Sequence, residues 1–566
     1  MLNWLAGRFS PAQQGGGALI SRKAVGTLIA RLDAEAPEPA VKALGNQIEN
    51  LSRKVLATPN GCRALKQLDE FAQQPVTELW DALLADSRGQ SVSETAWSTL
   101  THYYRVVQMG YRHCLENYSA SETISKRDLA DATIIACRAM MALARSMLLL
   151  RTRYCNPTPE IWSQIHNLVD WVERRGNANA QVLPYPGTVL DTTVERELLT
   201  ALLIQVAPTG SLLPGQIYAL ERLLRIYVSY YRFSDSYDEQ ARPFAYEPAS
   251  NTAPQRWIDG MQERPGFRYF GPGGAYVELC HARDQAHATR GLPEWLGAVH
   301  CSSEEYRELL DRLVKQWSTQ PPRRRERRDA CDGEILVAHD WGDIRLLVRF
   351  SELARSGRSF SYDTANVYRI NSTLQANSSD TLRDPRSDEA VNTGAALANL
   401  ISFEESLDHQ ASERWTLNDT SGAGLGATAD SIPAWVRVGM VVAFRHADGV
   451  DWQFAMVRRM NCAEGGRLTV GMTRIRGAAR SARLRVSAGP TDRRASGADP
   501  AIVYDALMLD EGVSSLLLPI GAFDQSWKYA LSCGDQKSVV KMQKPLERGL
   551  NFERVEVAPV EAARAA

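Results

Sequence analysis

The sequence lacks an excess of charge of either sign and lacks the cysteine patterns of metal or disulfide sites. Its 65 lysines and arginines nearly cancel its 66 aspartates and glutamates, so no broad field attracts nucleic acid or an anionic membrane. Its nine cysteines are scattered and form no Cys-x-x-Cys pair, which argues against structural zinc and against a disulfide framework. We therefore expect no nucleic-acid partner, no metal site and a reducing compartment.

Motifs of enzyme active sites are also missing. The sequence shows no Ser-His-Asp set, no paired-carboxylate pattern and no helical pair of metal-ligating histidines. The glycine-rich stretch 270–274 is not followed by Gly-Lys-Ser/Thr, and its Pro272 removes an N–H donor that a phosphate cradle needs. We interpret this stretch as a turn before a strand over residues 276–280. We expect no catalytic residues and no cofactor, and an enzyme is the weakest of the alternatives.

Long uninterrupted apolar runs are absent as well. The most apolar stretch, Ala132 to Leu150, contains Arg138 and Arg145, and charges are costly at bilayer depth. We predict a buried helix there, and therefore no membrane insertion. The first nine residues have no basic segment followed by an apolar core, so we expect no signal peptide and a cytoplasmic protein.

Helical periodicity dominates residues 21–233. One predicted helix has Pro159 at its first position and apolar residues at Ile161, Ile165 and Leu168 on one face. Short Pro/Gly connections between such segments favour a helical bundle or a right-angled helical array. A helical domain of this kind more often binds a partner than catalyses a reaction. We therefore expect a protein partner or self-association through this half.

Short runs rich in β-branched and aromatic residues fill residues 414–475 and are separated by Gly, Asp and Asn. This pattern predicts consecutive antiparallel strands of a small barrel. The first turn carries Asp419, Ser421 and Gly424 in the pattern Asp-x-Ser-x-x-Gly, directly after a predicted strand. Asp and Ser side chains bond backbone groups in turns, and Gly424 permits a positive φ or close approach by a ligand. An ordinary turn is the alternative interpretation.

The residues around this turn follow the motif order of a known family. After Asp419 to Gly424 come Val438-Gly439, Val457-Arg458-Arg459 and Val470-Gly471, and residues 323–328 upstream hold five arginines in six positions. The chain resembles the PilZ domain, the bacterial receptor module for cyclic di-GMP. The motifs of that family are Arg-x-x-x-Arg before the first strand and Asp/Asn-x-Ser-x-x-Gly at a strand end. The resemblance implies a barrel with an insertion between the arginine segment and the turn.

The resemblance also implies a cyclic di-GMP site that contains Arg323, Arg324, Arg327, Arg328, Asp419, Ser421 and Gly424. Arginine suits this ligand because its planar fork grips phosphate oxygens, bonds guanine O6 and N7, and stacks on the base. Asp419 and Ser421 would accept and donate at the other guanine edge. Three or four such contacts, less ordering costs, give about micromolar binding. From composition alone, the arginine run is either this clamp or a solvated linker.

We predict a multidomain α+β protein with an α-helical N-terminal half and a C-terminal antiparallel β-barrel of PilZ type with additional strands. The expected layout is a flexible N-terminus (1–20), an α-helical domain (21–233), a linker (234–264), a small α/β connecting region (265–318), a barrel (319–480) with an insertion at 360–410, a β extension or second small barrel (481–558) and a disordered tail (559–566). Within these parts we expect strands at 334–338 and 344–350, a helix at 395–407 and a basic linker at 476–494.

The function predicted from these features is that of a non-catalytic cytosolic receptor. It would couple cyclic di-GMP binding in the barrel to partner or oligomer interactions of the helical domain, in motility, pilus or biofilm control. Ligand would order the arginine segment against the barrel. The main alternative is a scaffold with the same barrel that no longer binds cyclic di-GMP.

Overall fold

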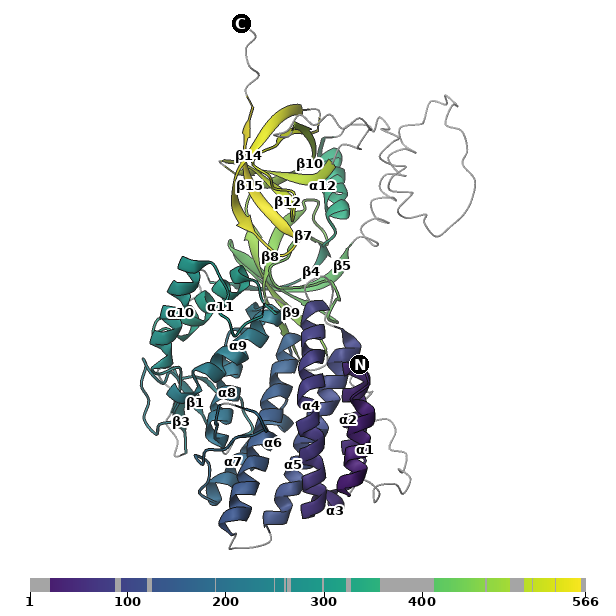
Figure 1. Ribbon diagram of the computed structural model, residues 1–566. Coiled ribbons are helices and arrows are strands. Elements are labelled where there is room, and N and C mark those ends of the chain that lie inside the picture. Colours follow the sequence, from purple (N-terminus) through teal and green to yellow (C-terminus); the bar gives the residue numbers. More distant parts are fainter. Residues whose placement is uncertain are drawn as a thin grey trace. The chain divides into compact units, whose positions relative to one another are not determined.

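The chain divides into two compact units (Figure 1). The helical unit comprises Met1–Arg325, Asp430–Val436 and Arg459–Thr469, and the β unit comprises Glu326–Ala429, Arg437–Arg458 and Val470–Ala566. The structure is a computed structural model, and it describes residues 21–86, 93–119, 125–188, 190–248, 250–258, 261, 266–297, 300–321, 327–356, 412–463, 466–488, 503–511, 513–534 and 536–560.

Helices make up most of the first unit. They are α1 (Arg22–Leu32), α2 (Pro37–Glu49), α3 (Arg53–Leu56), α4 (Pro59–Asp86), α5 (Glu94–Ser119), α6 (Lys126–Thr152), α7 (Pro159–Arg174), α8 (Val194–Val206), α9 (Pro214–Ile226), α10 (Ala275–Thr289) and α11 (Ser303–Trp317). Two 3-10 turns lie at Thr209–Ser211 and Val228–Tyr230. A small sheet in the order β2-β1-β3 is formed by β1 (Phe244–Tyr246), β2 (Gln255–Arg256) and β3 (Arg268–Phe270).

Three long helices lie in the middle of this unit, where α5 packs against both α4 and α6 (Figure 1). Their apolar faces share one core, which contains Leu65, Leu100 and Leu143. Among the described residues, α6 is the helix long and apolar enough to cross a membrane, and 72% of its most apolar stretch is buried inside the protein. Its Arg138 is only 3% exposed and donates a hydrogen bond to the carbonyl oxygen of Pro184 at 2.6 Å. The helix predicted around Ala132 to Leu150 is thus a core element.

A buried carboxylate, Asp69 on α4, lies within this core. It is 1% exposed and accepts hydrogen bonds from the hydroxyls of Tyr103 and Tyr111 at 2.6 Å each and of Tyr185 at 3.0 Å. Burial raises the pKa of Asp69 even though these donors favour its charged form. The tyrosines therefore serve the internal packing and hydrogen bonding of the unit.

The middle of the chain differs from two predictions. Residues 276–280, predicted as a strand, lie inside α10, which follows the glycine-rich stretch and ends at Arg290 in the left-handed conformation. A five-residue stretch with apolar residues on both sides of Glu278 fits a strand or a helix equally well, and its length alone does not decide between them. The predicted linker 234–264 contains β1 and β2, which pair with each other and, through β1, with β3.

The β unit contains two closed antiparallel barrels. The first barrel has the order β4-β5-β6-β9-β8-β7 and consists of β4 (Asp329–Ala338), β5 (Glu413–Thr420), β6 (Gly424–Ala429), β7 (Val441–His446), β8 (Gln453–Cys462) and β9 (Leu468–Ile475). The second barrel has the order β10-β11-β12-β15-β14-β13 and consists of β10 (Ala478–Ala488), β11 (Val503–Glu511), β12 (Val513–Pro519), β13 (Lys528–Cys533), β14 (Gln536–Arg548) and β15 (Phe552–Pro559).

A helix and a strand of the β unit replace two predicted segments. Residues 344–350, predicted as a strand, belong to α12 (Trp341–Ser356), whose Ile344, Leu347 and Val348 are buried at helical spacing. They join a core that includes residues of both barrels. The basic stretch 476–494, predicted as a linker, contains β10. Its arginines alternate with buried Ala482 and Leu484, as expected for a strand with one face in the core.

The predicted fold class is confirmed. The N-terminal half is helical, the C-terminal part is antiparallel β structure, and the additional strands close a second barrel. The predicted flexible N-terminus (1–20), insertion (360–410) and helix (395–407) lie outside the described residues, as do residues 561–566 of the predicted tail.

Candidate functional site at the β4, β5 and β6 strand ends

Pairing between β4 and β5 brings the arginine segment to the Asp-x-Ser-x-x-Gly turn. In this antiparallel pair Asp329 lies opposite Thr420, and Ala330 opposite Asp419. Arg328 directly precedes β4, so the register carries it to the end of β5 where the turn begins. Its guanidinium donates from Nη1 to Asp419 Oδ1 at 2.5 Å. The side chains are 23% and 30% exposed, so the pair is partly shielded from water and still accessible to a ligand.

The turn that follows β5 is closed by its own hydrogen bonds. The Ser421 N–H donates to the carbonyl oxygen of Gly424 at 2.8 Å, and the Gly424 N–H donates to Ser421 Oγ at 3.1 Å. Ser421 thus satisfies backbone groups, as Ser does in many turns. Its half-buried hydroxyl also donates to the carbonyl oxygen of Gly424 at 3.3 Å, so it stays at the strand end.

Two glycines make room in this site. A Cβ on Gly424 would lie 2.4 Å from the carbonyl oxygen of Met472, because β6 and β9 approach closely there. Gly424 therefore serves a close backbone approach, and it is not among the described glycines with positive φ. A Cβ on Gly426 would lie 2.7 Å from Asp419 Oδ1. The Asp419 carboxylate consequently lies over the bare backbone of Gly426, a residue that the sequence motif does not include.

Arg474 on β9 is a further basic residue at the turn. Its backbone N–H donates to the carbonyl oxygen of Ala423 at 2.9 Å, and its Nη2 donates to Thr420 Oγ1 at 2.9 Å. Its guanidinium also lies over the ring of Phe444, 5.1 Å from the centroid. Burial lowers the pKa of Arg474, although the nearby Cys331 opposes this effect. Arg474 lies 54 positions after Thr420, so only strand pairing reveals it.

The described site therefore unites four of the seven predicted residues: Arg328, Asp419, Ser421 and Gly424. Arg327 is exposed next to Arg328, and Arg323 and Arg324 lie outside the described residues. A guanidinium fork, a carboxylate and a hydroxyl at one strand edge can bind phosphate oxygens and the donor edge of a guanine. Among the described residues, no group of three or more His, Cys, Asp or Glu is placed to hold a metal ion.

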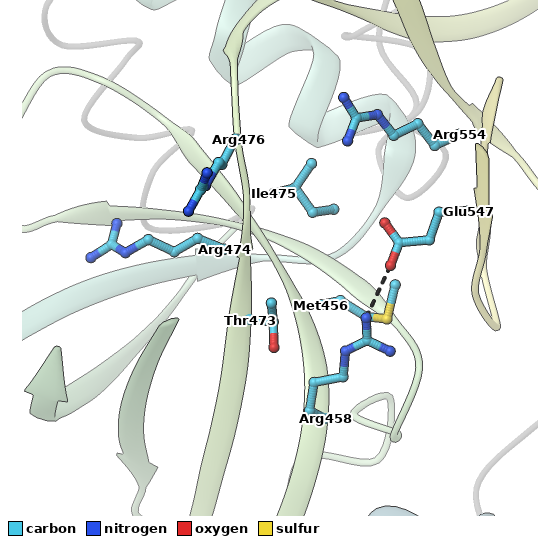
Figure 2. A pocket seen from close by; sticks show the side chains of 8 residues that line it. All are labelled: Met456, Arg458, Thr473, Arg474, Ile475, Arg476, Glu547 and Arg554. Atoms are coloured by element: carbon cyan, nitrogen blue, oxygen red, sulfur yellow. Dashed lines mark hydrogen bonds and ion pairs between the residues drawn. The ribbon is translucent and has the colours of Figure 1, made fainter. Parts of the chain in front are cut away.

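A second basic feature of the β unit is a pocket of about 240 Å³ where the two barrels meet (Figure 2). It is lined by Met456, Arg458, Thr473, Arg474, Ile475, Arg476, Glu547 and Arg554. We call it the arginine pocket. Its residues come from β8, β9, β14, β15 and the connection after β9, so no short sequence motif predicts it.

Comparison with known proteins gives one match, over the helical half. Residues 23–239 match the family model described as the N-terminal domain of the cyclic-di-GMP receptor FimW. No curated protein and no solved structure shows a significant match. The match points to a cyclic-di-GMP receptor, the class predicted from the β residues, and it does so through a different part of the chain. It includes no residue of the strand-end site, whose role is therefore argued from its geometry.

Proposed function

We propose that this protein is a non-catalytic cyclic di-GMP receptor of the PilZ type, with its ligand site at the strand ends of β4, β5 and β6. Arg324, Arg328 and the neighbouring arginines 323 and 327 would grip the phosphates and stack on the bases. Asp419 and Ser421 would bond a guanine edge, and Gly424 would keep the turn close to β9.

The observation that carries this proposal is the contact between Arg328 and Asp419. Two motifs that the sequence separates by 91 positions meet with a 2.5 Å hydrogen bond at one strand edge. The register of β4 with β5 enforces this meeting, so it does not depend on side-chain placement alone. The family match of residues 23–239 supports the same ligand independently.

Ligand binding at this site would be an exchange of partners. Arg328 bonds one carboxylate oxygen of Asp419, and a carboxylate has two oxygens with acceptor capacity beyond one donor. A guanine can therefore bond Asp419 while Arg328 turns toward a phosphate. A surface ion pair contributes only about 0–1 kcal/mol, so the exchange costs little compared with two or three new charge-assisted hydrogen bonds.

The same contact favours the second candidate, a scaffold without ligand. If Arg328 and Asp419 satisfy each other, the pair can serve to hold the end of β4 on β5 and need not bind a nucleotide. Absence of cyclic di-GMP binding with an intact Arg328–Asp419 pair would identify this role.

The helical unit is proposed to transmit the signal by binding a protein partner or by self-association. It has a core of its own, so it can present a stable surface whether or not ligand is bound. We further propose a cytoplasmic location and a role in pilus, motility or biofilm control. No cofactor and no catalytic residue enter this proposal.

Calorimetric titration of the full chain with cyclic di-GMP tests the proposal. We expect about micromolar binding, and loss of at least tenfold in affinity in the Arg324→Ala, Arg328→Ala double variant. Arg485→Ala is the matched control, because Arg485 is exposed on β10 and outside the site. Binding by the double variant as tight as that of the wild type would show that the ligand binds elsewhere on the chain. No binding by the wild-type chain would support the scaffold.

A further inference from the structure

The arginine pocket combines an excess of positive charge with a concave shape. Four of its eight lining side chains are guanidinium groups and one is a carboxylate, Glu547. Guanidinium groups that converge on one cavity repel each other unless an anion lies between them. The cavity of about 240 Å³ has room for about eight water molecules, which is enough for one or two phosphate groups.

One ion pair crosses the pocket between the two barrels. Arg458 Nη2 on β8 donates to Glu547 Oε1 on β14 at 3.0 Å, and Figure 2 shows the two side chains pointing toward one another. They are 44% and 32% exposed, and solvent screens such a pair. Glu547 is thus the partner of one of the four arginines, and the ion pair between them is weak.

The remaining arginines are positioned by the strands around the pocket. Arg554 on β15 donates from Nε to the Ser515 hydroxyl at 3.1 Å, and this contact fixes the side-chain stem. Arg474 is held by Thr420 and stacks on Phe444, while Arg476 is exposed at the end of β9. Arg458 and Arg474 come from the first barrel and Arg554 comes from the second. A single anion in the pocket can therefore contact both barrels.

We propose that the arginine pocket is a second anion site, which binds a phosphate group of a nucleotide or of a small phosphate compound in exchange for the Glu547 carboxylate. A phosphate offers several oxygens to guanidinium forks, whereas Glu547 offers two. Binding would thus replace one ion pair between the barrels by a shared anion. None of the predicted motif residues lines this pocket, although Arg474 belongs both to its lining and to the strand-end turn.

The test uses the full chain and two probes, inorganic pyrophosphate and cyclic di-GMP, in calorimetry and thermal unfolding at constant ionic strength. The variants are Arg458→Ala, Arg554→Ala and Glu547→Gln, with Arg485→Ala as the matched control outside the pocket. We expect about tenfold weaker pyrophosphate binding in either arginine variant. Glu547→Gln keeps the side-chain shape and removes the competing charge, so we expect it to bind pyrophosphate more tightly.

The outcomes answer two separate questions: whether the site exists, and whether it binds a small phosphate compound or the dinucleotide. Pyrophosphate binding that falls in the arginine variants and rises in Glu547→Gln supports a site for small phosphates. The same pattern with cyclic di-GMP alone supports a site for the dinucleotide. Binding of both probes that is the same in all variants overturns the proposal. Arg328→Ala tests the strand-end site separately, so loss of cyclic di-GMP binding there leaves the pyrophosphate result interpretable.

Discussion

Arg328 donates a 2.5 Å hydrogen bond to Asp419, although the two residues are 91 positions apart. Because they touch, substitutions of the two residues are expected to be non-additive. We expect Arg328→Ala and Asp419→Ala each to weaken cyclic di-GMP binding at least tenfold. The double variant should lose little more affinity than the single variant that binds more weakly. Calorimetry on the four proteins of this cycle measures the coupling. Fully additive losses would show that the residues contact the ligand without acting on each other.

Gly424 and Gly426 are expected to respond differently to alanine. In Gly424→Ala the new methyl group meets the Met472 carbonyl oxygen at 2.4 Å, so β6 must move from β9 and the barrel loses about 1–3 kcal/mol of stability. In Gly426→Ala the methyl group meets Asp419 Oδ1 at 2.7 Å, the end of a side chain that can rotate. This variant should keep its thermal midpoint and lose ligand affinity.

Thermal unfolding and cyclic di-GMP titration of these two variants check the expectation together. Ala427→Gly, on the same strand, is a control for the general effect of altering β6 at a buried position. Loss of stability in Gly426→Ala equal to that in Gly424→Ala would show that Asp419 cannot move and is part of the barrel framework.

The sequence predicted the parts of the fold in which local patterns are unambiguous. The helices of the N-terminal half have long apolar faces, and the strands around the turn are runs rich in β-branched and aromatic residues between turn residues, so both were predicted correctly. The strands predicted at residues 344–350 and 276–280 were wrong, because short segments rich in apolar residues fit a helix and a strand alike; both lie in helices. β10 was missed because its arginines resemble those of a linker, whereas they form the outer face of a strand.

The candidate site was predictable only in its motif residues. Asp419, Ser421 and Gly424 are close in sequence, and Arg328 belongs to a dense arginine run. Gly426 reaches the site through the pairing of β5 with β6, and Arg474 reaches it from β9. Neither residue stands at a fixed spacing from the motif, so the sequence did not reveal them. The arginine pocket requires two barrels to meet, which is a property of packing.

Asp69 provides a pH-dependent prediction in the helical unit. Burial raises its folded-state pKa above the unfolded value of 3.8, so its stabilising contribution is complete below that pH and is lost as pH rises through the folded pKa. We expect the stability advantage of the wild type over Asp69→Asn to shrink as the pH rises above about 4. Urea unfolding followed by helical circular dichroism measures it. An advantage that grows over this range would contradict a raised pKa.

Tyr103→Phe keeps the carboxylate and removes one of the donors that favour its charged form. The variant should lose about 1–3 kcal/mol of stability, because the buried Asp69 carboxyl group loses a hydrogen-bond donor. A Tyr103→Phe variant as stable as the wild type would show that the Tyr103 hydroxyl does not stabilise the buried Asp69 carboxyl group.

Asp131 on α6 is expected to show the opposite pH dependence. Burial raises its pKa, but the hydrogen bonds from Lys66 at 2.5 Å and Tyr118 at 2.8 Å outweigh this effect and lower it below the unfolded value of 3.8. Its contribution is therefore present above the unfolded pKa and is lost as pH falls through the folded pKa. Because the side chain is 36% exposed, solvent screening limits the contribution to about 1 kcal/mol.

The advantage of the wild type over Asp131→Asn should thus hold from pH 7 to about pH 4 and decline below it, and Lys66→Met should remove most of it. A decline with rising pH, as expected for Asp69, would show that burial prevails over the Lys66 contact at Asp131 as well.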